Sequence, residues 1–197
     1  MDGTTSRPFL RVAAALGAVA MAAGLLSGCG SSGSGFIHPN VDFSYMRRAA
    51  VLPFGNLTSD RLADERMQSI FLMELLQADI LAIVDPRETV AAMQALGITS
   101  TGTLTSEQAV ALGEELSVDA LFFGVVEEYG YSQADRRRGP EITTVFGLTE
   151  TQTGALVWRT QAHSTGTSVW RRLFGGGSAD LYSVSVDTVR KALRTLL

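Results

Sequence analysis

The chain has 197 residues, of which 46% are hydrophobic and 18% charged, so length and composition predict a globular protein with one main domain. Its formal net charge of −4 argues against binding to nucleic acid, which selects basic surfaces. The single cysteine, Cys29, leaves no thiol partner for an intrachain disulfide, so the fold must depend on an apolar core.

Residues 1–28 have the pattern of a secretory signal peptide. Arg7 and Arg11 precede an apolar stretch from Val12 to Leu26, which is shorter than the roughly 20 residues that a membrane span needs. The stretch runs into Leu26-Ser27-Gly28-Cys29, which resembles the bacterial lipobox. That resemblance implies cleavage before Cys29, a diacylglyceryl group on its thiol and often an acyl group on the new amine. We therefore expect Cys29 to anchor the protein, because two or three acyl chains hold a protein on a bilayer.

Residues 29–47 are predicted to be the lipidated cysteine followed by a flexible tether. Gly30 to Gly35 consist of glycine and serine only, and the chain is expected to stay irregular until about Met46. Such a coil has ends about 20–25 Å apart on average and reaches only about 60 Å when fully extended. Whatever the domain binds should therefore lie close to the membrane that anchors it.

Residues 48–197 show alternating strand and helix patterns, taken here in chain order. Strands are predicted at Ala49–Phe54, Ile80–Val84, Ala120–Val126, Ile142–Thr149 and Ala155–Ser164. Helices are predicted at Arg61–Ala78, Glu88–Leu96, Thr105–Leu116 and Ala179–Leu196. Thr105 and Gln108 form a capping box at the start of the third helix. The predicted fold is α/β, a single domain whose mixed β-sheet is covered by helices on both faces.

The strand at Ala120–Val126 is expected to lie at the centre of this sheet. It is apolar without alternation, which is typical of a strand that is buried on both sides. Phe122 and Phe123 should therefore point to opposite, covered faces.

Three segments together resemble a known superfamily of bacterial envelope lipoproteins. They are Ala50 to Asp60 (AVLPFGNLTSD), Ala111 to Gly113 with Val118 to Gly124 (VDALFFG), and Thr153 to Trp158 (TGALVW). In this order, behind a lipobox, they resemble the superfamily of the curli-secretion lipoprotein CsgG, the penicillin-binding-protein activator LpoB and the amino-terminal domain of TolB. The resemblance covers about residues 48–197 and implies a periplasmic α/β lipoprotein that binds other proteins and has no catalytic residue. Ser117 departs from the pattern, because the family commonly has glycine at that turn.

Two arginine clusters are the candidate contact residues. One comprises Arg136, Arg137 and Arg138 in the loop from Tyr131 to Pro140, and the other comprises Trp170, Arg171 and Arg172. Charges on a lipid face cost about 2–4 kcal/mol at mid-bilayer, so these loops are not expected to form membrane hairpins of a pore. Guanidinium groups bind phosphate in two-pronged fashion, which suits lipid head groups or an acidic partner. The alternative is that both clusters are solvated turns.

No arrangement of catalytic or metal-binding residues is evident, and no cofactor is predicted. The two histidines, His38 and His163, are far apart in the sequence, which makes a metal site unexpected. Glu127 and Glu128 are adjacent carboxylates, but neighbours on a strand point to opposite faces, so they are not expected to act together. The chain also lacks a Gly-x-Ser-x-Gly turn and a phosphate-binding loop. The sequence therefore predicts a protein that is not an enzyme.

Two functions remain open. The first is an outer-membrane lipoprotein that faces the periplasm and serves as an accessory protein-binding module in secretion or envelope biogenesis. Gly30 and Ser31 after Cys29, in place of an aspartate retention signal, favour export to the outer membrane. The alternative is an activator of a peptidoglycan synthase, although family members with that role use a much longer linker. The expected partners are the membrane, through Cys29, and envelope proteins, and a homo-oligomer is compatible with either function.

Overall fold

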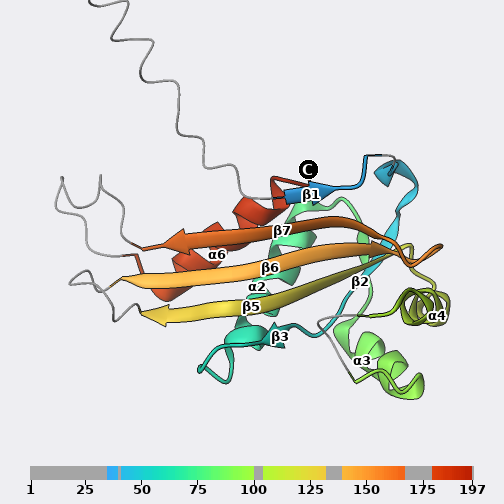
Figure 1. Cartoon of the computed structure of the whole chain (residues 1–197), viewed down its shortest axis with the longest axis horizontal. Helices are drawn as coiled ribbons and strands as arrows, with labels where there is room; N and C mark the ends of the chain where they lie inside the picture. The colour runs from blue at the N-terminus through green and yellow to red at the C-terminus, as the bar shows by residue number, and fades with distance from the viewer. Residues whose placement is uncertain (1–34, 40, 100–103, 132–138, 167–178, 197) are drawn as a thin grey trace, which may run out of the picture. The chain divides into compact units, whose positions relative to one another are not determined.

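A mixed β-sheet with helices on both sides organises residues 35–39, 41–99, 104–131, 139–166 and 179–196, which the computed structural model describes (Figure 1). The strands are β1 Gly35–Ile37, β2 Arg48–Val51, β3 Gly55–Asn56, β4 Ala82–Ile83, β5 Ala120–Tyr131, β6 Pro140–Glu150 and β7 Leu156–Thr165. The α-helices are α2 Ala63–Ala78, α3 Pro86–Ala95, α4 Ser106–Leu116 and α6 Leu181–Leu193, and η1 Phe43–Tyr45 is a short 3₁₀ helix. The predicted α/β fold class is confirmed.

The sheet has seven strands in the order β1-β7-β6-β5-β2-β4, with β3 paired to β5 beside β2. β2 runs parallel to β4 and β5, and β3 also runs parallel to β5. β5, β6, β7 and β1 are joined by antiparallel pairing, so the sheet has a parallel half and an antiparallel half. The predicted central strand is β5, which pairs with three other strands.

The predicted helices and strands are present, with shifted ends. β5 continues to Tyr131, well beyond the predicted end, because it pairs with β6 along its whole length. The third helix has the predicted capping box of Thr105 and Gln108. α3 begins two residues earlier than predicted, because the Asp85 carboxylate accepts a hydrogen bond from the Arg87 amide and Pro86 occupies the first turn.

The prediction of irregular chain from Cys29 to about Met46 is wrong for β1. This three-residue strand pairs with β7, with Phe36 opposite Arg159. A strand of three residues is too short to show alternation of apolar and polar side chains. Its backbone hydrogen bonds to a sheet edge require no particular side chains, so the glycine- and serine-rich composition before it favoured a coil. β1 lies at the outer edge of the antiparallel half (Figure 1).

Helices α2 and α6 cover one face of the sheet and form the larger part of the core. Phe122 is fully buried there, and its ring centroid lies 5.4 Å from that of Phe71. Phe71 also stacks on Phe146 at 5.2 Å. The Trp158 ring is buried with them, and its Nε1–H donates to Thr195 Oγ1 just after α6, at 3.0 Å. The aromatic cluster thus joins the central strands to both helices.

Helices α3 and α4 pack against the opposite face, but only over its parallel half. Their core contains Leu52 after β2, Met93 of α3, Leu112 of α4 and Leu121 at the start of β5. The sheet is therefore covered on both faces, as predicted, but unevenly. Within the described residues, no helix is long and apolar enough to cross a lipid bilayer.

The segments that carry the family resemblance have structural roles. The Asp119 carboxylate accepts hydrogen bonds from the amides of Arg47 and Arg48, at 2.8 and 3.0 Å, and so fixes β2 beside β5. The Thr151 hydroxyl donates to the Val118 carbonyl at 2.6 Å. Ser117, which stands where the family commonly has glycine, ends α4 in the left-handed conformation with φ 52°.

Candidate functional site: the open face of the antiparallel half

The candidate site is the surface of β5, β6 and β7 on the side away from α2 and α6, which we call the open face. In the described structure, no helix lies over the middle of β6 and β7 on this side (Figure 1). Burial along β7 alternates accordingly: Val157, Thr160 and Ala162 are buried, whereas Arg159 and Gln161 are exposed. The antiparallel half thus has one covered face and one that is accessible.

The strand register aligns the side chains of the open face in rows across three strands. From one end of the sheet to the other, the rows are Phe123–Gly147–Arg159, Val125–Val145–Gln161 and Glu128–Thr143–His163. The first two rows combine apolar residues of β5 and β6 with a polar residue of β7, whereas the third row is polar throughout. The open face therefore has an apolar region near α4 and a polar region at the far end of β7.

A groove with a volume of about 630 Å³ occupies the apolar region. Leu57, Phe123, Val125 and Leu156 supply apolar lining, with Leu57 72% exposed. Gly147 makes room for Phe123, because a Cβ at Gly147 would lie only 2.1 Å from Phe123 Cζ. The groove is thus a built feature of the sheet.

Phe122 and Phe123 point to opposite faces, as predicted, but only Phe122 is fully covered. Phe122 has no exposed surface, whereas Phe123 is partly buried and lines the groove. The expectation of two covered faces fails for Phe123 because α4 ends its coverage near this residue. The apolar run of β5 therefore reflects a core on one side and a groove on the other.

Glu127 and Glu128 lie on the same face, contrary to the prediction from strand alternation. The pairing of β5 with β6 shifts between Val126 and Glu128, which is a β-bulge. A bulge adds one residue to a strand and breaks the alternation of its side chains. Glu127 accepts a hydrogen bond from Gln161 of β7, and Glu128 accepts one from Thr143 of β6 at 2.6 Å, so both carboxylates stand on the open face.

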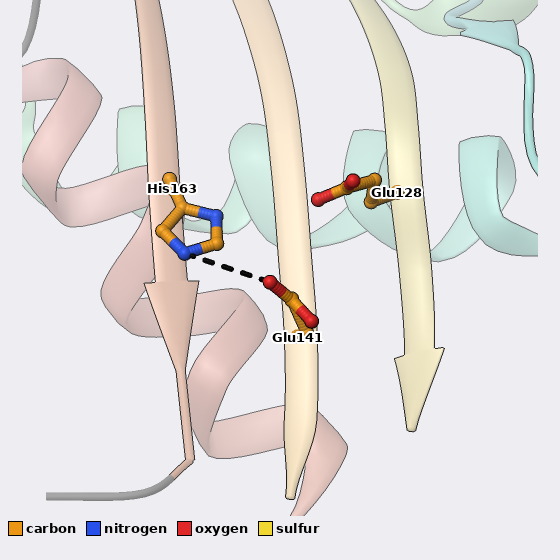
Figure 2. Close-up of side chains that lie close together, drawn as sticks. All are labelled: Glu128, Glu141 and His163. Atoms are coloured by element: carbon orange, nitrogen blue, oxygen red, sulfur yellow. Dashed lines mark ion pairs between the residues drawn. The ribbon is translucent and has the colours of Figure 1, made fainter. Parts of the chain in front are cut away.

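His163, which appears isolated in the sequence, lies between acidic residues in the structure. Figure 2 shows Glu128, Glu141 and His163 converging from β5, β6 and β7. The Nε2 atom of His163 lies 3.8 Å from Oε1 of Glu141, and both side chains are at least partly exposed. Strand alternation along β7 indicates that His163 lies on the same side as Arg159 and Gln161, so this much could be read from the sequence. The bulge that turns Glu128 to that side has no sequence signature of its own.

The residues predicted to contact the membrane or a partner are outside the described ranges. These are Cys29, Arg136, Arg137, Arg138, Trp170, Arg171 and Arg172. The described strand ends next to the two arginine segments lie together, because Tyr131 pairs with Pro140 and Thr165 pairs with Glu141. Both segments therefore join the sheet at the same end.

The fold is shared with bacterial proteins of known structure. The chain superposes on one chain of a single-residue variant of PelC from Paraburkholderia phytofirmans, whose structure is a dodecamer. The TM-score is 0.57 at 19% identity, over 84% of this chain and 98% of that one. It superposes on lipoprotein GNA1162 from Neisseria meningitidis with a TM-score of 0.53, at 16% identity, over 76% and 99% of the two chains. At these identities the similarity establishes the fold alone.

These matches support the architecture that the resemblance implies, and they do not show membership of the CsgG superfamily. The LpoB C-terminal domain from Escherichia coli matches with a TM-score of 0.44 at 16% identity, over 73% of this chain and 92% of that one, which is too loose to carry a functional conclusion. No family model matches the sequence. A search of the curated proteins finds no match either.

Proposed function

We propose that the chain is an outer-membrane lipoprotein, anchored through Cys29, that acts as a non-enzymatic assembly module on the periplasmic side. The lipobox-like Leu26-Ser27-Gly28-Cys29 supports the anchor. The shared fold with a lipoprotein, GNA1162, is consistent with it. The observation that carries the proposal is the open face. There, no described helix covers the antiparallel half of the sheet, and a groove is open to solvent.

The occupant of the open face in this proposal is a second copy of the chain. The PelC structures, which share the fold, are dodecamers. Exposed large apolar side chains also occur on the opposite side of the molecule, at Met73 and Leu76 of α2 and Tyr182 of α6. Two different exposed apolar surfaces on opposite sides of one molecule favour head-to-tail contacts between copies. Such contacts close into a ring when the rotation from one copy to the next returns to the first copy.

The short connection to the anchor would keep such an assembly at the membrane. Residues 30–34, five in all, separate Cys29 from the start of β1 at Gly35. Fully extended, that segment reaches only about 20 Å. The open face, whose outer strand β7 pairs with β1, would then work within a short distance of the bilayer.

The alternative function is activation of a peptidoglycan synthase, in which case a different protein would occupy the same face.

The arginine clusters at 136–138 and 171–172, with Trp170, remain proposed contacts to membrane or partner under either function. Changing these five arginines to serine should weaken membrane or partner capture and leave the melting temperature nearly unchanged, because exposed charges contribute little to stability.

Site-specific photocrosslinking in living cells tests the proposal. A photoreactive amino acid at Gln161, which is exposed on the open face, should give an adduct with twice the mass of the chain. The same amino acid at Val90, which is 38% exposed on α3, is the matched control and should give little of it. An adduct whose second component is a peptidoglycan synthase would support the alternative, and no adduct at Gln161 would refute docking at the open face.

A further inference from the structure

The polar end of the open face brings together three side chains of the kinds that bind metal ions. Glu128, Glu141 and His163 each offer one ligand atom, and these atoms all lie within 4.8 Å of one another. They come from three different strands, as Figure 2 shows. Each is exposed or partly exposed, so solvent and ions can reach the cluster.

The strand register and the bulge build this cluster. Glu128 and His163 flank Thr143 in one row across β5, β6 and β7, and Glu141 is the next residue of β6 on the same face. Thr143 is small, so the two longer side chains on either side can lean over it toward each other. Without the bulge between Val126 and Glu128, strand alternation would turn Glu128 to the covered face.

Thr143 also determines which nitrogen of His163 is available. Its hydroxyl donates to Glu128 Oε2 at 2.6 Å and lies 2.9 Å from His163 Nδ1. Because a threonine hydroxyl has a single proton, which goes to Glu128, the threonine oxygen must accept from Nδ1–H. In the neutral imidazole, Nε2 then carries the lone pair, and it faces the Glu141 carboxylate at 3.8 Å.

When the imidazole is neutral, its Nε2 lone pair and the Glu141 carboxylate face each other as two acceptors, an arrangement that a cation between them stabilises. No lysine or arginine side chain in the described ranges pairs with Glu128 or Glu141. Lys191, from α6, donates instead to the His163 carbonyl at 3.0 Å and to Ser164 Oγ at 2.9 Å. The cluster thus combines two carboxylates with an imidazole whose free nitrogen points at one of them.

We propose that Glu128, Glu141 and His163 bind a Zn²⁺ ion, with His163 Nε2 and one oxygen of each carboxylate as ligands. One imidazole and two carboxylates are donors that zinc accepts, and three protein ligands leave a position for water. Imidazole favours zinc over magnesium, which prefers oxygen donors alone. Thr143 is a positioning residue, since its hydroxyl orients the imidazole in the way that hydrogen-bond partners orient metal-binding histidines.

Zinc titration of the mature protein, lipidated at Cys29 and purified in detergent, tests this site when binding is followed by calorimetry. Wild type should bind one Zn²⁺ per chain and bind Mg²⁺ at least about tenfold more weakly. His163→Gln and Glu141→Gln should each weaken Zn²⁺ binding at least about tenfold, and Thr143→Val should weaken it about 10–100-fold through the lost orientation of the imidazole. His38→Gln is the matched control and should bind as wild type does.

A second measurement avoids dependence on variants. Zn²⁺ should protect His163 of the wild-type protein from modification by diethyl pyrocarbonate, read by mass spectrometry, while His38 stays reactive. Binding that survives His163→Gln and Glu141→Gln, binding that is lost in His38→Gln, or equal reactivity of His163 with and without Zn²⁺ would overturn the proposal.

Discussion

Truncating Phe122 and Phe123, which are adjacent on β5, should have very different effects on stability. Phe122 is fully buried, packs edge to face against Phe71 and lies near Trp158. Phe122→Ala leaves a cavity that the surrounding aromatic rings cannot fill, so we expect it to cost about 3–5 kcal/mol of the free energy of unfolding. Phe123→Ala opens a groove that solvent already reaches, so only part of the transfer free energy is lost, about 1–2 kcal/mol.

Chemical denaturation of both variants, with the transition followed by circular dichroism, measures the two free energies. An unchanged dependence on denaturant would show that the comparison concerns stability alone. Equal losses for the two variants would refute the uneven coverage of the sheet. A loss below about 1 kcal/mol for Phe122→Ala would remove that residue from the core.

Three further predictions concern turns and caps. Ser117→Gly should stabilise the protein by about 0.5–1 kcal/mol, because Ser117 adopts φ 52° at the end of α4; a loss of stability in thermal melts would contradict this. Gly154→Ala should lower the free energy of unfolding by at least about 2 kcal/mol, because φ is 71° there and the new Cβ would lie 2.4 Å from the Ser106 carbonyl oxygen. An unchanged free energy of unfolding would show that the turn can relax. Thr105→Ala should cost about 1 kcal/mol in urea denaturation through loss of the capping box, and Thr105→Ser, its control, should cost much less.

Local patterns predicted most elements of this fold because those elements follow local rules. The capping box at Thr105 is a matter of four consecutive residues, and the apolar run of β5 marks a strand in the middle of a sheet. The ends of elements differ from the predicted ones where pairing with a neighbouring strand lengthens a strand. Pairing with β6, for example, extends β5 as far as Tyr131. Strand β1 was missed because its only requirement is hydrogen bonding to an edge.

The candidate site was the least predictable part, because it depends on register. A sequence shows that Glu127 and Glu128 are neighbours, but only the pairing with β6 shows the bulge that turns both to one side. His163 similarly gains its acidic neighbours from strands that lie far from it in the chain. The groove exists because α4 stops covering the sheet near Phe123, and no local pattern states where a helix packs.

The mass of the assembly in detergent tests the central claim that a second copy occupies the open face. Leu57→Arg places a charge at the rim of the groove, and Leu57 is 72% exposed, so the variant should melt as wild type does. Val90→Arg on α3 is the matched control. By native mass spectrometry, we expect wild type and Val90→Arg to be oligomers and Leu57→Arg to be largely monomeric. A monomeric wild type, or a Leu57→Arg variant with the same mass as the wild-type oligomer, would contradict the claim.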